Sequence, residues 1–186
     1  MPPKVKVTKE AIVDAAVQIV RKDGAEAINA RAIAAMLNCS TQPVFSNFAT
    51  MEQLYLAVID KAQEIYNTYT QREMESGKYP AYKASGMAYI RFAKEEKELF
   101  KLLFMCERSQ EQSLEDTELF DRMLTLVQKN TGLSGTNAKL FHLEIWAYVH
   151  GIATMFATGF LNLDWELVST TITNIYQGLR KHHTME

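Results

Sequence analysis

The sequence predicts an all-α fold of about nine helices. Glycine and proline are scarce, at 8 and 4 of 186 residues, so long stretches lack the residues that punctuate strand-rich folds. Apolar residues recur at helical spacing along most of the chain, and no stretch shows the alternation of a half-buried strand. Both observations favour helices joined by short breaks.

The first three expected helices are short and have recognisable ends. Thr8 is a good N-cap for the first helix, and Gly24 ends its apolar pattern. Asn29 is expected to cap the second helix, which stops at Asn38, a residue that tolerates a left-handed backbone. Ser40 is expected to cap a third, very short helix.

The helices expected after residue 49 are longer. Their approximate ranges are 50–77, 81–94, 96–106, 116–129, 137–158 and 164–181. Asp164 is expected to cap the last one, and residues 130–135 form the clearest loop. The total of about nine helices follows from these six and the first three.

Charge is distributed unevenly along the chain. Residues 1–50 carry six cations and four anions, whereas the net charge of the whole chain is −2, so the remaining residues sum to −4. A basic head on an acidic body has the sign expected for DNA binding, although the difference is small.

No apolar run reaches the ~18 residues of a membrane span, and no signal peptide is expected.

Residues 8–54 hold the most informative pattern. Two short helices meet at a tight turn, Leu37-Asn38-Cys39-Ser40, which is the geometry of a helix-turn-helix. The helix after the turn carries side chains that can hydrogen-bond bases or phosphates: Thr41, Gln42, Ser46 and Asn47. Taken alone, this helix could equally be a polar face over a core of Val44, Phe45 and Phe48.

The surrounding residues favour the first interpretation. The spaced pattern is Thr8-Lys9-Glu10-x-Ile12-x-x-Ala15-Ala16, Gly24, Arg31-x-Ile33-Ala34, Ser40, Phe45-x-x-Phe48 and Leu54. It resembles the N-terminal signature of the tetracycline-repressor (TetR) family over about 50 residues. The resemblance implies a three-helix DNA-binding domain at residues 1–50 and a helical ligand-binding and dimerisation domain at residues 51–186.

The resemblance also implies roles for single residues. Those expected to face base edges are Thr41, Gln42, Pro43 and Ser46. Those at positions that lie against phosphates in such proteins are Asn29, Arg31, Ser40, Phe45 and Asn47. Lys4, Lys6 and Lys9 would lie near the DNA backbone.

Three positions depart from the family pattern. Phe45 replaces the usual tyrosine and lacks its hydroxyl, Asn38 replaces a frequent glycine, and Met51 replaces a common lysine. Weaker electrostatic anchoring on DNA is therefore expected. The implied function is a ligand-responsive repressor acting as a homodimer on palindromic operator DNA, with activation as an open alternative.

The C-terminal part contains one further local resemblance, Trp146-x-x-x-His150-Gly151, to a tryptophan–histidine–glycine subgroup. Trp146 and His150 are four residues apart and share a helix face, and Gly151 is expected to permit close helix approach. His150 is either a hydrogen-bonded core residue or a polar group in a ligand cavity. Aromatic and methionine side chains predict a pocket for an apolar or aromatic effector, lined by Tyr66, Tyr89, Phe104, Met123, Trp146 and His150.

The last two helices, about 137–158 and 164–181, are the expected dimer surface, because two pairs can form a four-helix bundle. The candidate interface residues, each of which could equally be intrachain core, are Met155, Phe156, Phe160, Ile172 and Ile175.

Two other classes of protein compete with this interpretation, an enzyme and a pure protein-interaction module. The sequence has no metal-binding helix motif, phosphate-binding loop or nucleophile elbow, so no catalytic residue, metal or cofactor is expected.

Cys39 and Cys106 form no spaced framework, which favours a reducing cytoplasm. Phe104 and Met105 predict that Cys106 is buried and inert.

Overall fold

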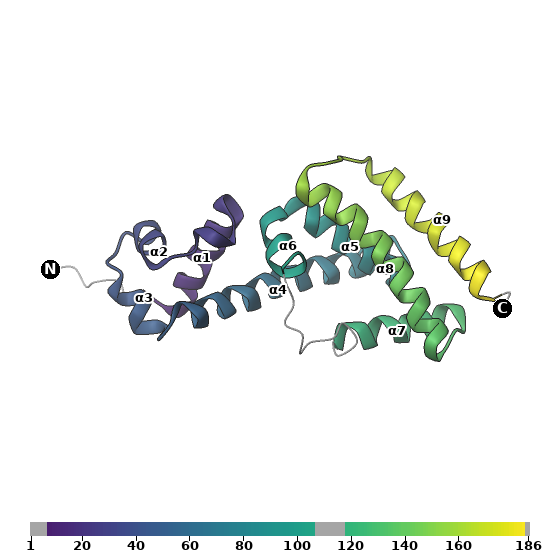
Figure 1. Ribbon diagram of the computed structural model, residues 1–186, viewed down its shortest axis with the longest axis horizontal. Coiled ribbons are helices and arrows are strands. Elements are labelled where there is room, and N and C mark those ends of the chain that lie inside the picture. The colour runs from purple at the N-terminus through teal and green to yellow at the C-terminus, as the bar shows by residue number, and fades with distance from the viewer. Residues whose placement is uncertain (1–6, 107–117, 185–186) are drawn as a thin grey trace. The chain divides into compact units, whose positions relative to one another are not determined.

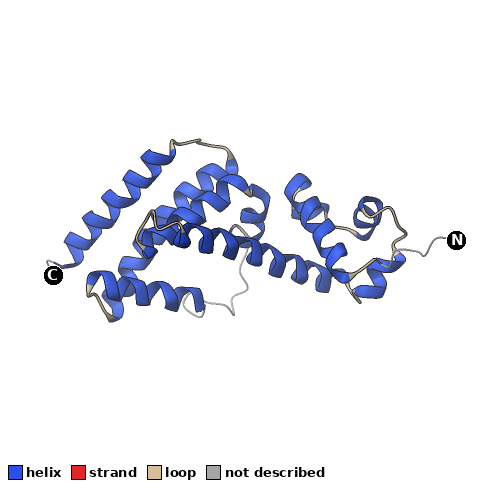
Figure 2. Ribbon diagram, turned by 180° about the vertical axis from the view of Figure 1, so that it is seen from behind, coloured by secondary structure: helices blue, strands red, loops and turns tan. Residues whose placement is uncertain are grey.

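The computed structural model describes residues 7–106 and 118–184, in which all regular structure is helical (Figures 1 and 2). Nine α-helices and one short 3₁₀ helix (η1) lie in these residues. Their bounds are α1 Lys9–Asp23, η1 Ala25–Ala27, α2 Ala30–Met36, α3 Gln42–Asn47, α4 Met51–Glu75, α5 Ala81–Glu95, α6 Lys97–Phe104, α7 Glu118–Thr131, α8 Gly135–Thr158 and α9 Trp165–Thr184. The predicted fold class is confirmed.

Most helix ends lie where capping chemistry predicts them. The Thr8 hydroxyl accepts the N–H of Ala11 at 3.1 Å, and Asp164 Oδ1 accepts the N–H groups of Glu166 and Leu167 at 2.8 and 3.2 Å. Each cap satisfies N–H groups that have no partner within the helix. Gly24 ends α1 with a positive φ of 86°, which glycine adopts without strain.

The expected cap of the third helix is wrong. Helix α3 begins at Gln42, and Thr41 rather than Ser40 is its N-cap residue, without a side-chain cap bond. Thr41 already has helical dihedral angles, φ −71° and ψ −14°, and its carbonyl accepts the N–H groups of Val44 and Phe45. Pro43 has no N–H in this first turn, so fewer donors need a cap.

The described chain forms two compact units. The first contains residues 7–67 and 96–106, and the second contains residues 68–95 and 118–184. Helix α4 therefore contributes its first part to one unit and its last part to the other. These units are defined by packing. The expected division at residue 50 separates domains by their function, so it stays a prediction.

The first unit is built around α1, against which η1, α2, α3 and α6 pack. Its core side chains are fully buried or nearly so: Ile12, Val20, Ile33, Val44, Phe48, Leu54, Val58, Leu99 and Phe100. Two hydrogen bonds from the Arg21 guanidinium to the Glu96 carboxylate, at 2.8 and 2.6 Å, join the C-terminal end of α1 to the start of α6. This bidentate pair adds directional bonding to the apolar contact.

The second unit is centred on α8, with α5, α7 and α9 beside it (Figure 1). Gly86 on α5 faces Val149 on α8, and a Cβ placed on Gly86 would lie 3.5 Å from the Val149 side chain. The large core residues of this unit are Met87, Ile90, Phe92, Phe141, Val149, Ile152 and Phe156. Within the described ranges, none of the helices has the length and apolarity needed to cross a membrane.

Candidate functional site

The turn between α2 and α3 has the tight geometry that the sequence predicts. Asn38 adopts a left-handed φ of 50°, and the Cys39 N–H donates to the Ala34 carbonyl at 2.9 Å. Val44 on α3 and Phe48 at its C-cap are buried, with exposed fractions of 0 % and 2 %. The side of α3 opposite this buried pair is therefore turned away from the core.

The exposed part of α3 consists of Gln42, Phe45 and Ser46. The Ser46 hydroxyl donates to the Gln42 carbonyl at 2.9 Å, so its proton is used within the helix. Thr41 and Pro43, also expected to face bases, are partly buried beside them. Helix α3 carries no charged side chain, so its exposed surface can offer hydrogen bonds and apolar contact but no ion pair.

The residues expected near phosphates fall into two groups. Lys9, Arg31 and Ser40 are exposed, and the Lys9 ammonium lies 5.0 Å from the centre of the Phe48 ring. This cation–π contact places a positive charge beside α3.

Asn29 and Asn47 form the second group, because their amides are already bonded within the protein. Asn29 Oδ1 caps α2 by accepting the N–H groups of Arg31 and Ala32, and Asn47 Nδ2 donates to the Pro43 carbonyl at 2.8 Å. Lys4 and Lys6 lie outside the described residues.

The six residues expected to line a ligand pocket are divided between the two compact units. Tyr66 and Phe104 belong to the first unit, where their rings meet edge to face at 5.2 Å. The other four belong to the second unit. Met123 is buried, and its sulfur accepts the Ser85 hydroxyl at 3.4 Å.

Tyr89, Trp146 and His150 form a compact group between α5 and α8. The Tyr89 hydroxyl lies 2.8 Å from His150 Nδ1, and the Trp146 and His150 rings stack with centres 5.2 Å apart. The shared helix face predicted for Trp146 and His150 is confirmed. His150 is only partly buried, so it is a hydrogen-bonded side chain at the edge of the core.

A second tyrosine–histidine pair is one that the sequence did not predict. The Tyr82 hydroxyl lies 2.9 Å from His142 Nδ1, and the Phe120 ring meets the His142 ring edge to face at 5.2 Å. Burial lowers the pKa of His142 to about 4 and raises the pKa of Tyr82, so both groups are neutral near pH 7. The sequence carries one signal for this second pair. Tyr82 precedes Tyr89, and His142 precedes His150, by about two helical turns each, so the two pairs can repeat along α5 and α8.

Two groups of polar contacts join the helices of the second unit. Buried Glu73 accepts two hydrogen bonds from Arg91, at 2.9 and 3.3 Å, and the Arg91 guanidinium lies 4.3 Å from the centre of the Trp165 ring. His183 Nε2 lies 2.7 Å from Glu144 Oε2, which joins the end of α9 to α8. These contacts hold α4, α5, α8 and α9 together by polar bonds as well as by burial.

Two expectations about single residues are wrong. Cys106 is exposed because α6 ends at Phe104 and the chain leaves the helix face, and Met105 is likewise 42 % exposed. A Cβ placed on Gly151 would meet no neighbouring helix within 4 Å among the described residues, so Gly151 does not permit a close helix approach within this chain. A Cβ placed on Gly86 would be in ordinary van der Waals contact with Val149.

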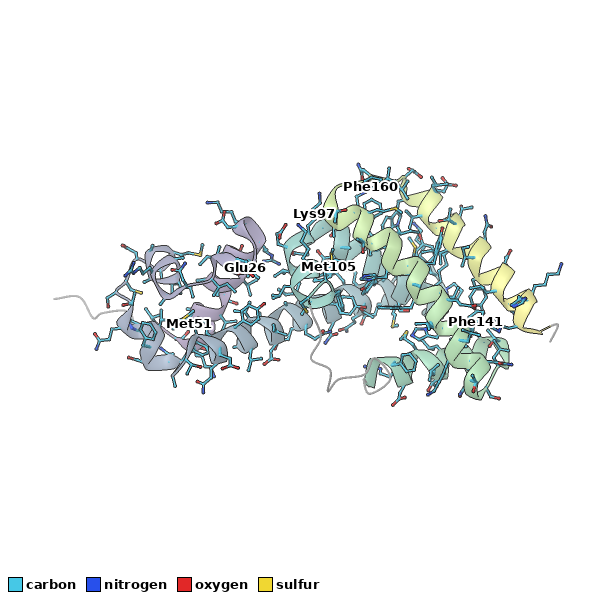
Figure 3. All side chains as sticks on the ribbon, in the orientation of Figure 1. Glu26, Met51, Lys97, Met105, Phe141 and Phe160 are labelled. Atoms are coloured by element: carbon cyan, nitrogen blue, oxygen red, sulfur yellow. The ribbon has the colours of Figure 1, made fainter. Side chains whose placement is uncertain are left out.

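The residues predicted for the dimer surface differ in how far their side chains are exposed. Phe156 and Ile172 are buried at 3 % and 4 % and belong to the core of the second unit, whereas Phe160 is 75 % exposed after the end of α8 (Figure 3). Met155 and Ile175 are partly buried. Other large apolar side chains exposed on or between α8 and α9 are Leu140, Leu143, Leu161 and Leu167.

Comparison with known proteins gives consistent results. Residues 82–171 match the family profile described as "Tetracyclin repressor-like, C-terminal domain". The matched range includes Trp146, His150 and Gly151, but the description assigns no subgroup by that motif. No curated protein matches the chain.

Three solved structures share the fold. A protein of unknown function from Rhodococcus sp. RHA1 is 20 % identical, with a TM-score of 0.76 over 97 % of this chain and 99 % of that one. A TetR-like transcriptional regulator from the same organism is 16 % identical, with a TM-score of 0.71 over 94 % and 97 %. A Clostridium perfringens protein that bears the name of a fatty acid metabolism regulator is 16 % identical, with a TM-score of 0.62 over 90 % and 97 %. Residues 82–171 therefore form a TetR-like C-terminal domain, and the whole chain shares its all-helical fold with these three structures.

Proposed function

We propose that this protein is a ligand-responsive transcriptional repressor that acts as a homodimer on a palindromic operator. The observation that carries the proposal is the exposed, uncharged surface of α3, which packs on α1 and α2 in a chain with a TetR-like C-terminal domain. Helix-turn-helix proteins place such a helix in the major groove, where side chains reach base edges. Such a regulator would act in the cytoplasm and would catalyse no reaction.

The proposed DNA contacts divide into two kinds. Gln42 on α3 is exposed and can pair bidentately with adenine, so it would contribute to sequence discrimination. Lys9 and Arg31 are exposed cations that would contact phosphates and contribute affinity without sequence preference. Four further residues would support these contacts from the same surface: Ser40, Thr41, Pro43 and Ser46. Asn29 and Asn47 would act chiefly by shaping the helix ends.

A binding experiment tests both assignments. Duplexes are selected from a random pool with the purified protein, and Gln42→Ala and Lys9→Ala are titrated against a selected and a scrambled duplex. Gln42→Ala should lower the ratio of the two affinities by about 5-fold or more, because a bidentate contact is worth about 1–3 kcal/mol of discrimination. Lys9→Ala should weaken both affinities by similar factors. A wild-type protein that enriches no sequence would refute the proposed function.

We propose a ligand site at Tyr89, Trp146 and His150, with Met123 on the neighbouring helix α7. The support is their hydrogen-bonded and stacked arrangement between α5 and α8, which offers aromatic surface and a polar pair. A bound effector would act by favouring one of two arrangements of the chain. Tyr66 and Phe104 belong to the other compact unit, so the proposed site does not include them.

Fluorescence can test the site because the chain has two tryptophans. In Trp165→Phe, Trp146 is the only tryptophan, and the aromatic dye anilinonaphthalene sulfonate serves as the probe. Quenching of Trp146 by the dye, weakened in a Trp165→Phe/His150→Ala variant, supports the site. Quenching that is the same in both variants contradicts it.

We also propose that α8 and α9 form the homodimer surface. Phe160 and the exposed leucines of these helices support it, because such side chains are usually covered in a stable dimer. Phe160→Asp should therefore shift the protein toward monomer in sedimentation equilibrium, whereas Leu56→Asp, at an exposed leucine of α4, serves as the control.

A further inference from the structure

Helix α3 exposes an aromatic ring where a DNA-binding surface would ordinarily carry polar groups. Phe45 is 55 % exposed, whereas Phe48, three residues further along the chain, is 2 % exposed. Phe48 packs in the core and contacts the Lys9 ammonium. Phe45 therefore contributes little to the core of the first unit, and its ring is available to a partner.

The chemistry of its neighbours limits what this surface can recognise. The proton of the Ser46 hydroxyl and one N–H of the Asn47 amide are donated to carbonyls of α3 itself. Gln42, three residues before Phe45, lies on the adjacent part of the helix surface and is exposed. The surface thus combines one exposed amide with one apolar ring.

A phenylalanine ring cannot donate a hydrogen bond to a phosphate, because it has no hydroxyl. In the major groove of DNA, the apolar group that a base pair presents is the 5-methyl group of thymine. Burying the Phe45 ring against that methyl removes apolar surface of both molecules from water.

We propose that Phe45 is a specificity-determining residue that recognises the 5-methyl group of a thymine in each half-site. Together with an adenine contact by Gln42, it makes α3 a reader of A·T base pairs. The inference rests on the proposed function, since it requires α3 to lie in the major groove.

Replacing thymine by uracil tests the contact, because uracil lacks only the methyl group. Each thymine of a selected duplex is replaced in turn, symmetrically in both half-sites, and the dissociation constant is measured. Wild type should lose about 4-fold in affinity per half-site at one position, which corresponds to one buried methyl group. Phe45→Ala should bind the thymine and uracil duplexes equally at that position.

Two further variants keep the test decisive. Phe45→Leu retains an apolar side chain and should keep part of the preference for thymine, and Gln42→Ala should keep the full preference at the Phe45 position. Where Phe45→Ala binds too weakly, the titration is run at lower salt, which strengthens phosphate contacts without affecting the methyl comparison. Phe45 is exposed, and an unchanged thermal melting curve of Phe45→Ala confirms the fold.

The outcomes separate the two proposals. A wild type that binds the selected duplex but is indifferent to uracil at every position overturns the role of Phe45 and leaves the DNA-binding function intact. A preference for thymine that Phe45→Ala retains also overturns it, because another residue then reads the methyl group. A wild type that selects no duplex overturns the proposed function and the role of Phe45 with it.

Discussion

His142 should make the stability of the second unit depend on pH. Its side chain is 8 % exposed, pairs with the Tyr82 hydroxyl at 2.9 Å and meets the Phe120 ring. Burial lowers the pKa of His142 from 6.5 to about 4. In the unfolded chain the imidazole takes up a proton near pH 6.5, whereas in the folded chain it stays neutral until near pH 4.

The sign and the size of the effect follow from this difference. Between pH 6.5 and pH 4 the unfolded state binds more protons, so the free energy of unfolding falls as the pH falls through this window. The pKa shift of His142 lowers the free energy of unfolding by about 3 kcal/mol over the whole window. About 2 kcal/mol of this loss falls between pH 7 and pH 5. Well above pH 6.5 the imidazole is neutral in both states, so His142 contributes no pH dependence there.

Urea unfolding of wild type and His142→Gln at pH 7 and pH 5 measures this contribution. Glutamine can keep a hydrogen bond to Tyr82 but does not titrate, so the variant should lose about 2 kcal/mol less than wild type on acidification. Titration of the His142 ring by NMR gives the pKa directly. Equal losses of stability in the two proteins, or a ring that titrates near pH 6.5, would refute the reasoning.

Two other predictions concern local structure. Asn29→Ala should lower the free energy of unfolding of the first unit by about 1 kcal/mol in urea titrations, because two N–H groups of α2 lose their cap; an unchanged midpoint would contradict this. Gly159→Ala should destabilise the second unit by about 1 kcal/mol, since Gly159 ends α8 with φ +71°. Gly178→Ala, within α9 and with open space around its Cβ position, should stabilise it by up to about 1 kcal/mol. Thermal melts of the two glycine variants should therefore shift in opposite directions.

The sequence predicted the helices well because local signals determine their ends. Thr8, Asn29 and Asp164 form the caps that their residue types favour, and each acts on N–H groups two or three residues away. The cap predicted at Ser40 is wrong because Thr41 already has a helical conformation and Pro43 reduces the need for a cap. Such a choice between adjacent residues depends on backbone geometry that residue type does not determine.

Contacts between distant helices were harder to predict. Trp146 and His150 could be assigned to one face because a single helix carries both. Tyr82 and His142 are 60 residues apart, and only the packing of α5 on α8 brings them together. The same limitation applies to Tyr66 and Tyr89, which the sequence suggested for one pocket and the fold places in different compact units.

The exposed residues of the head show a third limit. Phe45 and Phe48 have the same side chain three positions apart; taken alone, the helix allowed both as core, whereas the family resemblance placed Phe45 near a phosphate. The structure buries Phe48 and exposes Phe45, because only one of them follows Val44 by a full helical turn. The exposure of Phe45 in the folded chain is therefore needed to propose that its ring contacts a base.

The most direct test of the central claim is a titration of the purified protein against the promoter DNA that flanks its own gene, at two salt concentrations, with a scrambled duplex as control. We expect a dimer to bind one palindromic sequence with higher affinity than the scrambled duplex, and more weakly at the higher salt concentration as counterions compete for the phosphates. Equal affinity for the two duplexes, here and in a selection from random DNA, would contradict the account of this protein as a sequence-specific regulator.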